Sequence, residues 1–207
     1  MNRKVKYLSI LVVLFALNAN AQKVKFGLRG GVNIATIAKS ETNTLKPRLG
    51  VNLGGFVDFG ITEHFSIQPG LQVTTKGARD NGNYRFRSTY IEIPVYALYN
   101  LNLGDVKLFG GAGPYFALGV GGQELGTDAN GNTYQQTIAW DQAGAWRRPD
   151  AGLGLILGVE FQPAVQVGLN YDLGIANIHN PVDGNDGRKA YNRVLGIFIG
   201  YTFNAGK

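Results

Sequence analysis

The sequence predicts an all-β protein, an eight-stranded antiparallel up-and-down transmembrane β-barrel with short periplasmic turns and longer extracellular loops. Three observations lead to this prediction. Apolar residues occupy every second position in eight segments after residue 22, which is the period of a β-strand with two different faces. The connections between these segments alternate between short turns and long polar loops, as in outer-membrane barrels. The apolar positions carry almost no charge, whereas a water-facing surface would need charge for solubility.

The first residues of the chain have the pattern of a secretory signal peptide. Three basic residues precede an apolar run at 7–17, and the small-residue sequence Asn-Ala-Asn-Ala follows it at 18–21. The run has 11 residues, fewer than the roughly 20 that a transmembrane helix needs. We therefore predict a cleaved signal peptide at 1–21 and a barrel domain at 22–207, exported to the outer membrane of a Gram-negative envelope.

The composition argues against several other classes of protein. The chain has 20 basic and 14 acidic residues, and removal of the leader with its three basic residues leaves a net charge of +3. Basic residues form no cluster, so no nucleic-acid partner is predicted. Cysteine is absent, which excludes disulfides, thiolate zinc sites and a cysteine nucleophile. The two histidines, His64 and His179, are expected at opposite membrane faces, so we predict no enzyme activity and no catalytic, cofactor or metal site.

Four strands are predicted in the first half of the mature chain. Their apolar series run over 24–34, 49–59, 65–73 and 91–99. In the first strand, Phe26 and Leu28 alternate with charged residues, and in the fourth, Ile91 and Ile93 lie on either side of Glu92. Such alternation predicts strands whose two faces meet different surroundings.

Four more strands are predicted in the second half. Their apolar series run over 106–118, 153–161, 165–173 and 195–203. Many of the positions between the apolar residues are glycine, for example Gly154 and Gly158. The total of eight is even, as single-chain bacterial outer-membrane barrels require.

The connections differ in length at the two ends of the strands. Short turns are predicted at 62–63, 102–105 and 162–163. Long loops rich in Gly, Asn, Asp, Thr and Arg are predicted at 36–46, 77–83, 121–148 and 176–190. In an outer-membrane barrel the turns face the periplasm and the loops face the outside of the cell.

The polar positions of the strands predict an interior network of mutually paired charges, because an unpaired buried charge is costly. Its predicted members are Lys25, Arg29, Arg48, Asp58, Glu92, Lys107, Glu160 and Asp172. Glu92 is expected to pair with Arg29 or Arg48. Glycines on the same series leave room for bulky neighbours, so the lumen is predicted to be filled, without a wide aqueous pore. The alternative is a soluble barrel of the lipocalin type, in which the charges would form a solvated outer face.

Six aromatic residues lie on the apolar series near the turn ends of their strands. They predict a girdle at the periplasmic membrane–water boundary, where amphipathic rings are favoured. The residues are Phe59, Phe65, Tyr99, Phe161, Tyr201 and Phe203. Trp140 and Trp146 lie in the longest loop, where they either reach the opposite interface or cover loop backbone.

Five segments of the chain resemble the PorT-type outer-membrane β-barrel family. Residues 90–95, YIEIPV, are similar to the Y-[LI]-E-I-P-[LV] segment of that family. The segments 30–37, 110–116, 171–178 and 195–203 also resemble it, in the same order along the chain. The chain departs from the usual barrel-insertion signal, which ends on the final aromatic residue, because four residues follow Phe203.

The resemblance implies a fold and a location more than an activity. It implies outer-membrane lipid around the barrel and the barrel-insertion machinery as a partner during assembly. One family member is linked to gliding motility and protein secretion, which implies envelope or secretion-complex proteins as further partners. Our functional hypothesis is a structural or surface-interaction role through the extracellular loops, above all 121–148. The alternatives are an accessory subunit of a secretion or envelope complex, and a narrow channel.

Overall fold

The computed structural model describes residues 24–39, 45–80, 84–128, 130–142, 146–161, 164–181 and 187–204. These residues contain nine β-strands. No helix among them has the length and apolar character that crossing a membrane requires. The predicted signal peptide at 1–21 and the predicted turn at 162–163 lie outside the described residues.

The nine strands follow one another along the chain. They are β1 (Val24–Lys39), β2 (Arg48–Gly60), β3 (Phe65–Arg79), β4 (Arg85–Leu103), β5 (Val106–Thr127), β6 (Thr133–Thr137), β7 (Pro149–Phe161), β8 (Val165–Gly174) and β9 (Ala190–Asn204). All of them except β6 correspond to the eight strands predicted from the alternation of apolar residues.

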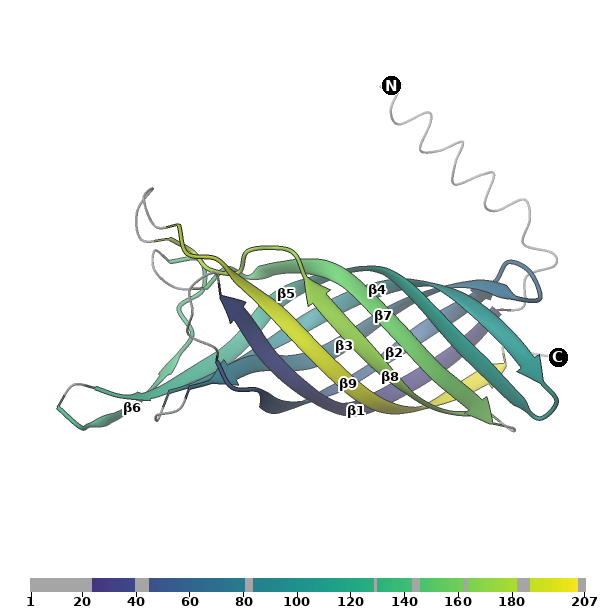
Figure 1. Cartoon of the computed structure of the whole chain (residues 1–207), viewed down its shortest axis with the longest axis horizontal. Coiled ribbons are helices and arrows are strands. Elements are labelled where there is room, and N and C mark those ends of the chain that lie inside the picture. The colour runs from purple at the N-terminus through teal and green to yellow at the C-terminus, as the bar shows by residue number, and fades with distance from the viewer. Residues whose placement is uncertain are drawn as a thin grey trace, which may run out of the picture.

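Eight of the strands close into one antiparallel barrel. Each pairs with its neighbour in the chain, β5 pairs with β7, and β9 returns to pair with β1. Figure 1 shows the strands tilted against the long axis of the barrel, with the short connections at one end and the long ones at the other. The predicted fold class, an eight-stranded antiparallel up-and-down barrel, is confirmed.

β6 is an additional strand within the predicted long loop 121–148. β5 continues to Thr127, and its residues 123–127 pair with β6, so the two form a hairpin that projects beyond the barrel (Figure 1). All five residues of β6 are exposed to solvent. Because both faces of this hairpin are polar, the sequence shows no two-residue alternation there, and the prediction of a loop without strand was wrong.

Other strands are also longer at the loop end than their apolar series. β3 was predicted to end at Val73, but it continues to Arg79. Beyond Val73 both faces of the strand hold buried residues, among them Thr74, Thr75 and Lys76, so the apolar–polar alternation ends before the strand does. The predicted loop 77–83 therefore began too early, and Lys76 was left out of the predicted strand.

The two faces of the strands differ in exposure as the alternation requires. Leu53 and Leu157 are among the most exposed apolar side chains, with 69% and 63% of their surface accessible on the outside of the barrel. Asn33 and Glu92 on the opposite face are buried at 1% and 0%. The barrel therefore has an apolar outer surface and a polar, filled interior, the arrangement of a barrel surrounded by lipid.

Glycines inside the barrel make room for aromatic rings. A Cβ atom at Gly158 would overlap the ring of Phe109, and one at Gly154 would crowd the ring of Tyr96. A Cβ atom at Gly168 would similarly collide with the backbone and a ring beside it. The interior is therefore filled by bulky side chains that lie over bare backbone.

Replacing Gly113 by alanine should destabilise the barrel. The new Cβ would overlap the carbonyl oxygen of Val95 on the adjacent strand, which cannot move without breaking the sheet. We expect a loss of about 1–3 kcal/mol in the free energy of unfolding. The control is Gly110→Ala on the same strand, whose Cβ would lie 3.3 Å from the mobile Leu157 Cδ1. Urea titration of the folded fraction, read from heat-modifiable gel mobility, compares the two; equal stability of both variants would contradict the packing argument.

Candidate functional site

A buried lysine and two carboxylates occupy the lumen toward its loop end. The Lys76 ammonium lies 2.7 Å from Glu92 Oε2 and 3.0 Å from Asp150 Oδ2, and none of the three side chains is accessible to solvent. It also lies 4.4 Å from the centre of the Tyr115 ring, a cation–π contact. Three strands, β3, β4 and β7, are thereby joined across the interior at one level of the barrel.

Further hydrogen bonds hold the two carboxylates in place. The Gln72 amide donates to Glu92 Oε1 at 2.6 Å, and the Asn192 amide donates to Asp150 Oδ2 at 2.8 Å. The Tyr115 hydroxyl is a weaker donor to Asp150 at 3.4 Å. These partners add β5 and β9 to the cluster, so five of the eight barrel strands meet at Lys76. We call Lys76, Glu92, Asp150 and these partners the lysine cluster.

A second layer, nearer the turn end, is built around Arg29. Its guanidinium lies between the rings of Phe56 and Phe198, 4.5 Å and 4.4 Å from their centres. It donates to Gln68 Oε1 and Gln166 Oε1, both at 3.1 Å. A planar cation between two rings fills the cross-section of a small barrel closely. This arginine layer and the lysine cluster block the lumen at two levels.

The partner of Glu92 differs from the predicted one. Neither Arg29 nor Arg48 bridges Glu92; its cation is Lys76. Lys76 was missed because it follows the apolar series of β3, although it has the same parity as the inward-facing Ser66. Asp150 likewise precedes the apolar series of β7 with the parity of its inward residues. Continuing each strand's parity by a few residues would have brought both into the predicted interior.

The other predicted charges fall into two groups. Lys25 and Lys107 both reach Glu160, at 3.6 Å and 3.0 Å, near the turn end of the lumen. Asp58 and Asp172 are buried inside, yet neither forms an ion pair with any residue that the structure describes.

The two predicted arginines also lack carboxylate partners. Arg48 begins β2 at the loop end and is half-buried, and neither it nor Arg29 forms an ion pair in the described ranges. Complete mutual pairing of the eight charges is therefore not what the structure shows. Inward side chains meet only when strand register places them at the same height, and parity does not contain that information.

The six predicted girdle residues lie near the turn ends of the strands on the outer face. Phe65 and Tyr99 are directly opposite in the β3–β4 register, with ring centres 5.1 Å apart. Tyr201 and Phe203 lie 4.9 Å apart on β9. Phe161 is also exposed on the outside. Phe59 at the end of β2 is only partly exposed. Their role at a membrane interface remains a prediction.

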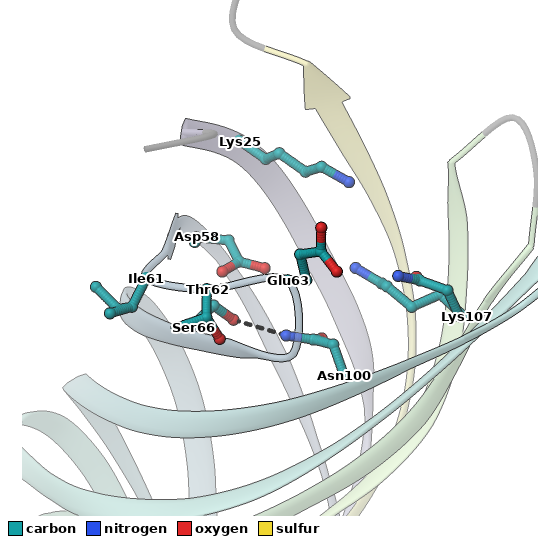
Figure 2. A pocket seen from close by; sticks show the side chains of 10 residues that line it. Lys25, Asp58, Ile61, Thr62, Glu63, Ser66, Asn100 and Lys107 are labelled. Carbon is teal, nitrogen blue, oxygen red and sulfur yellow. Dashed lines mark hydrogen bonds between the residues drawn. The ribbon is translucent and has the colours of Figure 1, made fainter. Parts of the chain in front are cut away.

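The turn end of the lumen opens into a polar cavity of 680 Å³, which we call the vestibule (Figure 2). A second cavity of 410 Å³ lies beside it and shares Lys25, Asn102 and Lys107 in its lining. The residues that line the vestibule are Lys25, Asp58, Gly60, Ile61, Thr62, Glu63, Ser66, Asn100, Asn102 and Lys107. The sequence analysis identified three of these, Lys25, Asp58 and Lys107, as interior charges, but not that they share a cavity.

One side of the vestibule contains hydrogen-bond acceptors to which no group donates among the described residues. Asn100 Nδ2 donates to Ser66 Oγ at 3.1 Å, the dashed line in Figure 2. The Asn100 Oδ1 and Asp58 Oδ1 atoms are buried without a hydrogen-bond partner among the described residues. Both side chains belong to residues that are 7% exposed.

The opposite end of the barrel is covered by apolar residues from the long loops and the strand ends. We call this cluster the extracellular cap; it consists of Ile37, Leu45, Ala78, Phe86, Ile138, Ile178 and Ala190, with Tyr84, Trp140 and Trp146 packed against them. Of the two alternatives for the tryptophans, packing within the loops is the one found. The Trp146 ring lies 4.2 Å from that of Phe86, and its Nε1 donates to Glu124 Oε1 at 2.5 Å.

Polar contacts reinforce the cap. The Tyr84 hydroxyl donates to Glu124 Oε1 at 3.3 Å. Burial and the neighbouring Glu124 carboxylate raise the pKa of Tyr84 above its ordinary value. In the hairpin connection, backbone N–H groups that donate to Asp128 lower the pKa of that carboxyl. The described parts of the loops are thus held to the barrel by packing and by hydrogen bonds.

Comparisons with known proteins agree with this geometry. Residues 20–180 match the family described as outer membrane protein beta-barrel domain. The structure of the outer membrane protein OprG from Pseudomonas aeruginosa is similar, with a TM-score of 0.52, 13% identity and coverage of 89% of this chain and 98% of that chain. At this level of identity the likeness concerns the fold alone.

Two further structures are similar. Ail of Yersinia pestis matches with a TM-score of 0.47 and 12% identity over 87% of this chain and 99% of that chain. Neisserial surface protein A matches with a TM-score of 0.47 and 16% identity over 85% of this chain and 96% of that chain. No curated protein matches the sequence.

Proposed function

The chain belongs to the outer membrane protein beta-barrel domain family, and on this basis we propose that it is a non-conducting, non-enzymatic barrel that acts through its extracellular loops. The protein is located in the bacterial outer membrane, with lipid around the barrel. The observation behind the proposal is the closed lumen. The lysine cluster, the arginine layer and the extracellular cap lie in series between the two ends of the barrel.

A closed lumen leaves the loop end as the surface on which the protein can act. The extracellular cap joins the strand ends and the described parts of the loops in a small apolar core of their own, which supports a preformed surface there. Beyond it projects the β5–β6 hairpin, whose β6 residues are all exposed (Figure 1). A projecting, solvent-exposed hairpin supports a role in contacts outside the cell.

The finer assignment, to the PorT-type family and to a secretion or envelope complex, rests on the sequence resemblance. The acid of the YIEIPV segment, Glu92, holds Lys76 in this structure. That segment thus has a role inside the barrel, and the likeness it carries concerns the fold. If the protein is an accessory subunit of such a complex, a stoichiometric partner should co-purify with it after mild solubilisation of membranes. A barrel that acts alone should co-purify with none.

Single-channel recording tests the closed lumen. The purified protein, shown to be folded by its heat-modifiable gel mobility, should give no steady open conductance in planar bilayers, because charged and aromatic side chains fill the lumen at two levels. An open porin in the same bilayers serves as the control for insertion and recording. Steady conductance from the wild-type protein would contradict the proposal and favour the narrow channel.

A further inference from the structure

We infer that the vestibule binds small zwitterionic molecules, namely amino acids or short peptides. Their ammonium group would meet Asp58, and their carboxylate would meet Lys25 and Lys107. This binding site lies at the turn end, away from the loop surface, and goes beyond the proposed function.

The basic side of the vestibule holds two lysines that share a single ion-pair partner. Lys25 and Lys107 come from β1 and β5 and share a single carboxylate, Glu160, at 3.6 Å and 3.0 Å. Glu160 also accepts a hydrogen bond from Gln166 at 2.8 Å. The two ammonium groups therefore share one ion-pair partner, and Glu63 is a further carboxylate in the vestibule lining. Both lysine side chains remain partly exposed, at 30% and 16%, so a ligand can reach them.

The acidic side has a carboxylate that forms no direct ion pair. Asp58 lies directly opposite Lys25 in the β1–β2 register, yet the Lys25 side chain reaches Glu160 instead. Arg29, deeper in the lumen, donates from Nη2 to Gln68 and Gln166; it interacts with Asp58 electrostatically but forms no ion pair with it. Asp58 therefore has neither an ion pair nor a hydrogen bond within the described part of the chain.

An unpaired carboxylate at 7% exposure is unfavourable, and a ligand ammonium group would compensate it. Asn100 lines the same cavity, and its Oδ1 is a second buried acceptor without a partner among the described residues. An ammonium group, with its three donors, matches such a set of acceptors.

The two charges select for a zwitterion. A purely anionic ligand would face repulsion from Asp58 and Glu63, and a purely cationic ligand would face repulsion from the two lysines (Figure 2). The volume of 680 Å³ lies within the range of about 300–1,000 Å³ that small-molecule sites occupy. Because the arginine layer closes its inner end, the vestibule is a pocket with one entrance and not part of a passage.

The test uses trialanine as the probe and the full-length protein in detergent micelles, with binding measured by calorimetry at neutral pH. Two blocked peptides, N-acetyl-trialanine and trialanine amide, each lack one of the two charges. Each blocked peptide should bind about tenfold more weakly than trialanine or worse, because each loses one charge-assisted contact. These comparisons use the wild-type protein, so they do not depend on whether a variant folds.

Variants then assign each charge to its side chain. The Asp58→Asn variant should bind trialanine and N-acetyl-trialanine equally. The double variant Lys25→Met, Lys107→Met should bind trialanine and trialanine amide equally. Asp141→Asn, at the loop end, is the matched control and should keep both preferences. Absence of trialanine binding at millimolar concentration, or equal binding of all three peptides to the wild-type protein, would overturn the inference. Neither result would affect the proposed closed lumen.

Discussion

Replacing Lys76 by methionine is expected to lower the free energy of unfolding by about 3–5 kcal/mol, the loss typical of breaking a buried ion pair. The side chain of methionine fills a similar volume, so the change removes the charge and little packing. Without the ammonium group, Glu92 and Asp150 would be left as two buried carboxylates without a cation. Their remaining hydrogen bonds, from Gln72 and Asn192, do not neutralise them.

A compensated variant separates lost charge pairing from lost packing. In the triple variant Lys76→Met, Glu92→Gln, Asp150→Asn, the stranded charges are removed together with the lysine. Replacement of a whole buried ion cluster by neutral groups is often close to neutral, so this variant should recover much of the lost stability. Urea titration in micelles, followed by heat-modifiable gel mobility, measures all three proteins. If the variant with Lys76→Met alone were as stable as the wild type, the lysine cluster would contribute nothing to the stability of the fold.

Replacing Leu155 by arginine is expected to destabilise the protein in a bilayer by about 2–4 kcal/mol, the loss measured for arginine on the lipid face near the midplane of such barrels. Leu155 is exposed on the outside of β7, six residues before Phe161 at the turn end. On a water-facing surface the same substitution would change stability by only about 0.5 kcal/mol or less. The substitution therefore distinguishes a lipid-facing apolar surface from a solvated one.

Ile61 supplies the matched control for this test. It is also an exposed apolar residue, but it lies in the β2–β3 turn, outside the strands. Ile61→Arg should leave stability in liposomes nearly unchanged, because the penalty falls to about 0–1 kcal/mol near the membrane interface. Equal, small effects of Leu155→Arg and Ile61→Arg in liposomes would be incompatible with a lipid-facing Leu155.

Much of the fold could be predicted from the sequence. The eight barrel strands follow from the two-residue alternation, and the closed antiparallel order follows from alternating short and long connections. The faces of the strands follow as well, since the parity of Leu53 or Glu92 is a local property of its own strand. The β5–β6 hairpin was missed because it is polar on both faces and so carries no alternating pattern.

The candidate site could be predicted only in part. The sequence identified Lys25, Asp58 and Lys107 as inward-facing, but not that they surround one cavity. It identified Glu92 as a buried acid, but assigned it the wrong cation. Lys76, the actual partner, lies past the end of the apolar series of β3, where the sequence has no signal that distinguishes strand from loop.

The sequence alone thus determined an eight-stranded barrel, its lipid-facing and interior faces, and an interior rich in charge and glycine. The tertiary structure alone decided which interior residues meet: Lys76 with Glu92 and Asp150, and Arg29 with two phenylalanine rings, while Asp58 forms no ion pair among the described residues. The physical reason is that alternation is set within each strand by the backbone geometry of consecutive residues. The height at which a side chain enters the lumen depends instead on the register and tilt of all the strands, which exist only once the barrel has closed.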